Sequence, residues 1–331
     1  MLKTPYLLFL GDAHDALSAK VARGIYDWRP DFALGQLRFD KCQADLGIPD
    51  ITIEEAVSKG AGTMVVGVAN RGGFIAESWI VVLKQALEAG MDLAAGLHDK
   101  LADVSELRET AARLDRKLFD VRHPTQSFPI GSGAKRAGKR LLGVGTDCSC
   151  GKMYTALAIE KEMHARGMKA DFRATGQTGI LISGAGVSVD AVISDFISGA
   201  VETLAPANDP DHWDLVEGQG SLYHPAYAGV TTGLIHGAQP DALVLCHEST
   251  RTHMRGLPDY PIPDMGDVMD LALRIARLTN PNAEFVGVAV NTTNLDNVAS
   301  KHFLVQTEDR FGLPTVDPVR TGVGRIVDAL R

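Results

Sequence analysis

The sequence of 331 residues has few cysteines, no large cluster of basic residues and no long apolar run. Four scattered cysteines are too few for a disulfide framework, which is typical of a protein in a reducing compartment. The formal net charge of −8 argues against a nucleic-acid or anionic membrane partner, because either needs a basic surface. No apolar run approaches the roughly 18 residues of a membrane span, and the apolar residues 5–10 are too few for an export signal. We therefore expect a cytoplasmic protein.

What the chain does contain is an alternation of short apolar runs with amphipathic segments, which predicts α/β structure with parallel sheets covered on both faces. Residues 1–122 carry this pattern, and we interpret them as a Rossmann-like domain. Residues 123–140 interrupt it with Pro, Gly, Ser and Lys, which is typical of a linker. The pattern resumes over 141–331 as a second α/β domain. The linker holds a short basic cluster, either solvated or helping to attract an anion: Lys135, Arg136, Lys139 and Arg140.

The stretch GVGTDCSCGKM, residues 143–153, predicts a phosphate-binding loop in this second domain. A glycine-rich turn that ends in Gly-Lys at the start of a helix directs backbone N–H groups and an ammonium toward an anion. The next position normally carries the Ser or Thr that binds Mg²⁺, but here it is Met153, whose thioether is a poor ligand for a hard cation. We therefore expect an anion site without a metal. Its residues are Gly145, Thr146, Asp147, Cys148, Ser149, Cys150, Gly151, Lys152 and Met153.

Two candidate bases lie in VEGQGSLYHP, residues 216–225. Glu217 follows an apolar strand, which would deliver its carboxylate beside the loop, where burial would raise its pKa and suit a general base. The alternative is a capping or ion-pairing role within the fold. His224 is the second candidate because imidazole titrates near neutrality, and the alternative there is a structural histidine.

Polar residues at other predicted strand ends are candidates for recognising a substrate. Arginine suits carboxylates because its guanidinium donates two parallel hydrogen bonds, although any one of these arginines can equally be a surface residue. The candidates are Arg173, Gln177, Arg251 and Arg255, with Arg71 in the first domain. Cys148 and Cys150 open an acyl-cysteine route if the helix dipole favours a thiolate, or they are only small side chains that let the loop curl.

The loop with five residues between its outer glycines resembles that of dethiobiotin synthetase and the cobyric acid synthases, and VEG at 216–218 resembles their later acidic loop. A closer resemblance runs through both halves of the chain. The segments WRPDFALGQLR, GTDCSCGKM, ATGQTGILI, VDAVISDFISGAVE and VEGQGSLYHPAYAGVTTGLIHGAQPDALVL are similar to the D-glutamate N-acetyltransferase family, which combines a Rossmann-like domain with a phosphate-loop domain. Met153 belongs to that family's pattern.

This resemblance implies transfer of an acetyl group from acetyl-CoA, as co-substrate, to the amine of D-glutamate by a homo-oligomer. The loop would hold the CoA phosphates without a metal, because no P–O bond is cleaved. Glu217, or else His224, would accept the amine proton in a direct transfer. Two other classes stay open: an ATP- and Mg²⁺-dependent kinase or ligase like dethiobiotin synthetase, and a non-catalytic module that binds CoA or a nucleotide.

Overall fold

The computed structural model describes residues 2–16, 18–70 and 72–330. The chain forms two compact units. The first consists of Met1–Thr125 with Gln177–Ala191, and the second of Gln126–Gly176 with Val192–Arg331. The chain therefore leaves the first unit, enters the second, returns to the first for a short segment, and then completes the second.

The first unit is built on a parallel five-stranded sheet in the order β2-β1-β3-β4-β5. The interior strand β1 is buried along its whole length, as expected for a strand covered on both faces. Its strands are β1 (Tyr6–Gly11), β2 (Ala33–Arg38), β3 (Thr63–Val66), β4 (Asp92–Ala95) and β5 (Leu118–Asp120). Its helices are α1 (Lys20–Trp28), α2 (Ile53–Ser58), α3 (Glu77–Glu88), α4 (Ser105–Leu114) and α6 (Gln177–Ser183), with short 3₁₀ turns at Pro30–Phe32, Leu101–Asp103 and Val189–Ala191.

Helix α6 comes from just past the midpoint of the sequence and packs against α1 of the first unit. Its Ile180, Leu181 and Ile182 are buried, and the Tyr6 hydroxyl donates to the Leu181 carbonyl. Burial of these apolar side chains explains why this segment belongs to the first unit.

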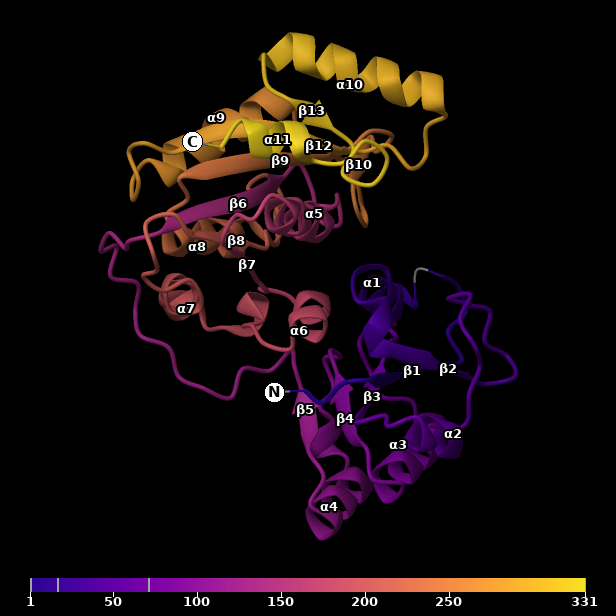
Figure 1. The fold of residues 1–331 in the computed structure, drawn as a ribbon. Coiled ribbons are helices and arrows are strands. Elements are labelled where there is room, and N and C mark those ends of the chain that lie inside the picture. Colours follow the sequence, from indigo (N-terminus) through magenta and orange to yellow (C-terminus); the bar gives the residue numbers. More distant parts are fainter. Residues whose placement is uncertain (1, 17, 71, 331) are drawn as a thin grey trace. The chain divides into compact units, whose positions relative to one another are not determined.

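The second unit contains a six-stranded parallel sheet in the order β13-β12-β9-β6-β8-β7 (Figure 1). Its strands are β6 (Lys139–Gly145), β7 (Ala170–Arg173), β8 (Trp213–Val216), β9 (Ala242–Glu248), β12 (Glu284–Asn291) and β13 (Thr315–Val316), and β10 (His253–Met254) pairs separately with β11 (Leu257–Pro261). Its helices are α5 (Lys152–Ala165), α7 (Ile197–Leu204), α8 (Ala228–Ala238), α9 (Met265–Ala276), α10 (Asn297–Phe311) and α11 (Gly324–Asp328), with a 3₁₀ turn at Ser194–Phe196. Helix α5 contacts α11, and α8 contacts α7 and α9, so the helices form two groups around the sheet.

Both units are α/β with parallel sheets, which confirms the predicted fold class. Strand β6 lies between β8 and β9. The chain passes from β6 to β7 and β8 on one side and then to β9 on the other side, so the direction of the connections reverses at β6. The glycine-rich loop leaves the carboxyl end of β6. Ligands of open parallel sheets bind at such a reversal point.

Arg136 and Arg140 of the basic cluster have a structural role, whereas Lys135 is exposed. Lys139 and Arg140 begin β6, at the opposite end of the strand from the loop and about 20 Å away at the rise of an extended strand. Arg140 is fully buried, and Arg136 donates to the Gly237 carbonyl.

Within the described residues, no helix is both long and apolar enough to cross a membrane.

Candidate active site

Three neighbouring strands deliver their carboxyl-terminal loops to one edge of the second sheet. Strand β6 pairs with β8 on one side and with β9 on the other, all parallel. The loop 145–153 follows β6, Glu217 follows β8, and residues 249–255 follow β9, which ends in His247 and Glu248. The structure thus brings together three of the segments in which the sequence predicts site residues.

The loop 145–153 has the backbone geometry of an anion site. Ser149 and Gly151 both adopt positive φ, 52° and 107°, which turns successive N–H groups inward. Helix α5 begins at Lys152, and no side chain caps its first turn, so these N–H groups are available to a ligand. The Lys152 ammonium folds back over the loop, 2.7 Å from the Asp147 carbonyl oxygen.

Glu217 is buried beside this loop. Its Oε2 accepts hydrogen bonds from the N–H groups of Thr175 at 2.9 Å and Gly176 at 3.0 Å. Burial raises the pKa of Glu217 to about 7, although these two hydrogen bonds and the charge of Lys152 each lower it. A carboxyl with a pKa near neutrality is available both as a base and as an acid at physiological pH.

Glycine at position 218 lets Glu217 approach the loop. A Cβ atom at Gly218 would lie 1.7 Å from the Gly143 carbonyl oxygen and 2.9 Å from Lys152 Cδ. Only a residue without a side chain allows β8 to end this close to β6, so the Glu-Gly pair sets the position of the carboxylate.

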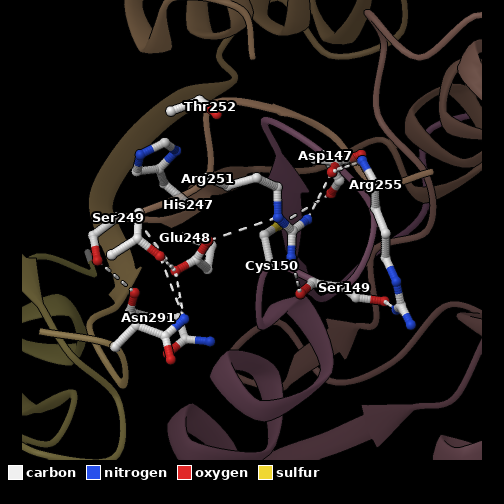
Figure 2. Close-up of polar contacts among 12 residues, drawn as sticks. Asp147, Ser149, Cys150, His247, Glu248, Ser249, Arg251, Thr252, Arg255 and Asn291 are labelled. Carbon is white, nitrogen blue, oxygen red and sulfur yellow. Dashed lines mark hydrogen bonds and ion pairs between the residues drawn. The ribbon is translucent and has the colours of Figure 1, made fainter. Parts of the chain in front are cut away.

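Arg251 is bound to the loop from the side of β9 (Figure 2). Its Nη1 donates to Asp147 Oδ2 and to the Cys148 carbonyl, both at 2.6 Å, and its Nε lies 3.7 Å from Glu248 Oε2. The guanidinium therefore neutralises a fully buried carboxylate and fixes the loop backbone. This makes Arg251 a positioning residue of the loop.

Arg255 is exposed at the rim of the loop. Its backbone N–H donates to Asp147 Oδ2 at 2.8 Å, and its Nη1 donates to Ser149 Oγ at 2.6 Å. The rest of its guanidinium faces outward from these contacts (Figure 2), so Arg255 remains our candidate for binding a substrate carboxylate.

The remaining predicted recognition residues lie outside this group of contacts. Arg173 forms an ion pair with buried Asp214 at 2.7 Å and also contacts Asp171. Gln177 belongs to the first unit, where its side chain packs against Gly96 at the end of β4. Arg71 lies outside the described residues.

His224 is buried, and a ring nitrogen lies within 4.8 Å of both a carboxylate oxygen of Asp147 and Cys148 Sγ. Its Nδ1 accepts a hydrogen bond from the Ala226 N–H at 3.2 Å, and its ring packs on Tyr227. Because Nδ1 is an acceptor, the proton of the neutral ring is on Nε2. In this tautomer the Nδ1 lone pair accepts the Ala226 N–H and the Nε2–H is the donor of the ring, which argues against His224 as the base.

Asp147, Cys148 and His224 are residue types that bind metal ions, but the groups around the Asp147 carboxylate disfavour a metal ion here. Asp147 Oδ1 accepts from the Cys148 N–H at 2.6 Å, and Oδ2 accepts from Arg251 and Arg255. A guanidinium 2.6 Å from the carboxylate competes directly with a cation at that position.

Cys148 is half-buried, and burial raises the pKa of its thiol above the ordinary value. The nearby charge of Lys152 lowers it by a smaller amount. Because the Nδ1 lone pair of His224 accepts the Ala226 N–H and the pKa of the thiol is raised, Cys148 lacks the activation of a catalytic thiolate.

Three residues of this site were not predicted from the sequence. Glu248 binds Arg251, Thr175 donates to Glu217, and the Ser221 hydroxyl donates to the Thr146 carbonyl. Glu248 ends β9 at the same edge of the sheet, directly after an apolar run, and this position is the signal that could have identified it.

Comparison with known proteins supports one family over the whole chain. Residues 129–327 match the model described as "Domain of unknown function (DUF1611_C) P-loop domain", and residues 38–124 match its Rossmann-like N-terminal domain. A D-glutamate N-acetyltransferase of Tritonibacter scottomollicae is 59% identical and covers 100% of this chain and 99% of its own. One of Pseudoalteromonas sp. is 49% identical and covers 98% of each. The crystal structure of a DUF1611 family protein from Anabaena variabilis, 32% identical, covers 99% of each chain with a TM-score of 0.89.

Proposed function

Because the chain belongs to the DUF1611 family and two full-length relatives are named D-glutamate N-acetyltransferase, we propose that it transfers an acetyl group from acetyl-CoA to the amine of D-glutamate. The products are N-acetyl-D-glutamate and CoA. The observation in the structure that carries this reading is a buried carboxyl, Glu217, with a pKa of about 7 beside an anion-binding loop.

The amine of an amino acid is protonated at neutral pH and must lose a proton before it attacks a thioester. Glu217 as the carboxylate accepts that proton. The amine nitrogen then forms a bond to the acetyl carbonyl carbon, the C–S bond breaks, and the leaving CoA thiolate takes up the second proton that the nitrogen loses. Backbone N–H groups of the loop are suited to stabilise developing negative charge at this site.

The transfer is direct in this proposal, within a complex of enzyme and both substrates. Cys148 Sγ lies within 4.8 Å of a ring nitrogen of His224, and its raised pKa and the tautomer of His224 argue against an acetyl-cysteine intermediate. A metal has no assigned role, because position 153 carries Met and the Thr155 hydroxyl, two residues further along the helix, donates to the Gly151 carbonyl. Assembly as a homo-oligomer and a cytoplasmic location stay predictions.

The test is to incubate the protein with acetyl-CoA and a panel of D- and L-amino acids in EDTA while following the release of free thiol. We expect thiol release with D-glutamate and undiminished rates in the chelator. Activity that instead requires ATP and Mg²⁺ would identify a kinase or ligase, and binding of CoA without any turnover would identify a binding module.

A further inference from the structure

The sequence predicts two roles at the loop 145–153: binding of the CoA phosphates and, through Glu217 or His224, acceptance of the amine proton. These two roles require positions that are far apart. If the loop 145–153 holds the CoA phosphates, the thioester lies at the far end of the pantetheine arm. That arm is as long as about four extended residues, or roughly 14 Å. The base that accepts the amine proton must lie at the thioester, because the amine attacks there.

Both candidate bases are instead at the loop. Lys152 is close enough to Glu217 to lower its pKa, and a Cβ atom at Gly218, the next residue, would touch Lys152 Cδ at 2.9 Å. The His224 ring lies within 4.8 Å of Asp147 and Cys148, inside the loop. An extended arm starting from the loop would carry the thioester away from both.

The charges around the loop also fit a small ligand better than a pyrophosphate. Three cations, Lys152, Arg251 and Arg255, contact the loop, and three carboxyl groups, Asp147, Glu217 and Glu248, belong to the same site. With Glu217 ionised these charges balance. A pyrophosphate beside Glu217 would disfavour its carboxylate form, which is the form that acts as the base. A single carboxylate adds less negative charge and still satisfies Lys152 and the open N–H groups.

Resting on the proposed function, we infer that the loop 145–153 binds a carboxylate of the acceptor amino acid, next to Glu217, and that the CoA phosphates bind elsewhere. Lys152 and the uncapped N–H groups of α5 hold the carboxylate, and this places the amine of the same molecule at Glu217. The loop thus has the anion-binding geometry of a phosphate loop, but it binds the acceptor amino acid and not the acetyl donor.

The experiment combines Lys152→Ala with two acetyl donors, acetyl-CoA and the acetyl thioester of N-acetylcysteamine, which lacks every phosphate. The KM for D-glutamate should rise about 10- to 100-fold with either donor, the loss expected for a charged hydrogen bond. The KM for acetyl-CoA should change less than about threefold. Lys152→Arg, which keeps the charge, should recover part of the affinity for D-glutamate. Partial misfolding lowers kcat but leaves both KM values in place, so this split isolates binding.

The inference fails if Lys152→Ala raises the KM for acetyl-CoA while leaving that for D-glutamate unchanged, or if its defect disappears with the truncated donor. Either result would put the CoA phosphates in the loop. If the truncated donor is not used by the wild type, the two KM values measured with acetyl-CoA decide alone. Absence of acetylation of D-glutamate by the wild type with acetyl-CoA would overturn the proposed function itself, which is a separate outcome.

Discussion

Arg251 Nη1 lies 2.6 Å from Oδ2 of the fully buried Asp147, so one ion pair joins the end of β9 to the loop after β6. The same nitrogen holds the Cys148 carbonyl, and Arg255 donates its backbone N–H to the same carboxylate oxygen. The conformation of the anion-binding loop therefore depends on a residue about 100 positions away in the sequence.

Replacing Arg251 should destabilise the protein much more than replacing an exposed arginine. Arg251→Ala leaves the Asp147 carboxylate buried without its partner, which costs about 3–5 kcal/mol in free energy of unfolding. Arg310→Ala is the matched control, because the Arg310–Asp264 pair is about half exposed and such pairs contribute about 0–1 kcal/mol. Urea denaturation of both variants measures the difference. Equal losses would show that the Arg251 pair does not hold the loop.

Glu217→Gln should lower kcat by about 10²–10⁴-fold, the loss typical of a missing general base, with D-glutamate still bound. In the wild type the carboxylate is the active form. The rate should therefore fall as the pH drops through about 7, the pKa of Glu217. A pH–rate profile of both proteins checks this. A wild-type profile without that acidic limb, or a fully active variant, would place the base elsewhere.

The same carboxyl should make stability depend on pH. The pKa of Glu217 rises from 4.5 to about 7 on folding, so the folded state binds this proton more tightly than the unfolded state. Its favourable contribution is fully present below about pH 4.5 and is lost as the pH rises through about 7. Relative to Glu217→Gln, which does not titrate, the wild type should lose about 3 kcal/mol between pH 4.5 and 8. Denaturation curves at several pH values measure this difference, and a constant difference would contradict the burial effect.

The tautomer of His224 predicts different effects for two amide substitutions. The amide nitrogen of Gln reaches the position of Nε2, whereas that of Asn reaches only the position of Nδ1. His224→Gln should stay within about fivefold of the wild-type kcat/KM, and His224→Asn should lose about 10- to 100-fold, as for a hydrogen bond to a charged group. If both variants lose activity to the same extent and the acidic limb of the pH profile moves, His224 acts as a base.

Cys148→Ala should retain turnover within about tenfold of the wild type, because direct transfer needs no thiol on the enzyme. Steady-state kinetics should show intersecting lines, as for a complex containing both substrates. Mass spectrometry of the protein incubated with acetyl-CoA alone checks for an acetylated residue. Finding acetyl on Cys148 together with parallel, ping-pong lines would establish the covalent route.

The sequence predicted the strands and the glycine-rich loop well because both depend on residues that are adjacent in the sequence. Strands such as β1 and β9 are continuous apolar runs, and the loop carries its glycines at the turns that need them. Helix α10 was missed for a physical reason. It exposes Val298 and Val305 while burying Ser300 and Thr307, so its hydrophobic pattern does not follow the helical period.

The parts of the candidate site that follow from the order of the strands could be predicted from the sequence. The parts that depend on contacts between side chains distant in the sequence could not. Placing Glu217 at the loop follows from a strand ending beside β6. The carboxylates that bind the arginines are distant from them in the sequence and reach them only in the folded protein. Arg251 binds Asp147 and Arg173 binds Asp214, and no local pattern reveals either pair. The orientation of the His224 ring likewise depends on one backbone N–H, that of Ala226.

The return of residues 177–191 to the first unit means that the two units are not a simple tandem. A fragment ending near residue 125 would expose the surface of α1 that α6 covers, and a fragment beginning there would carry three unburied apolar residues, Ile180, Leu181 and Ile182. The joint between the two family models, near residues 124–129, is therefore a poor place to cut. Two halves made there should be insoluble apart and should recover when coexpressed, because the C-terminal half carries a piece of the first unit's core.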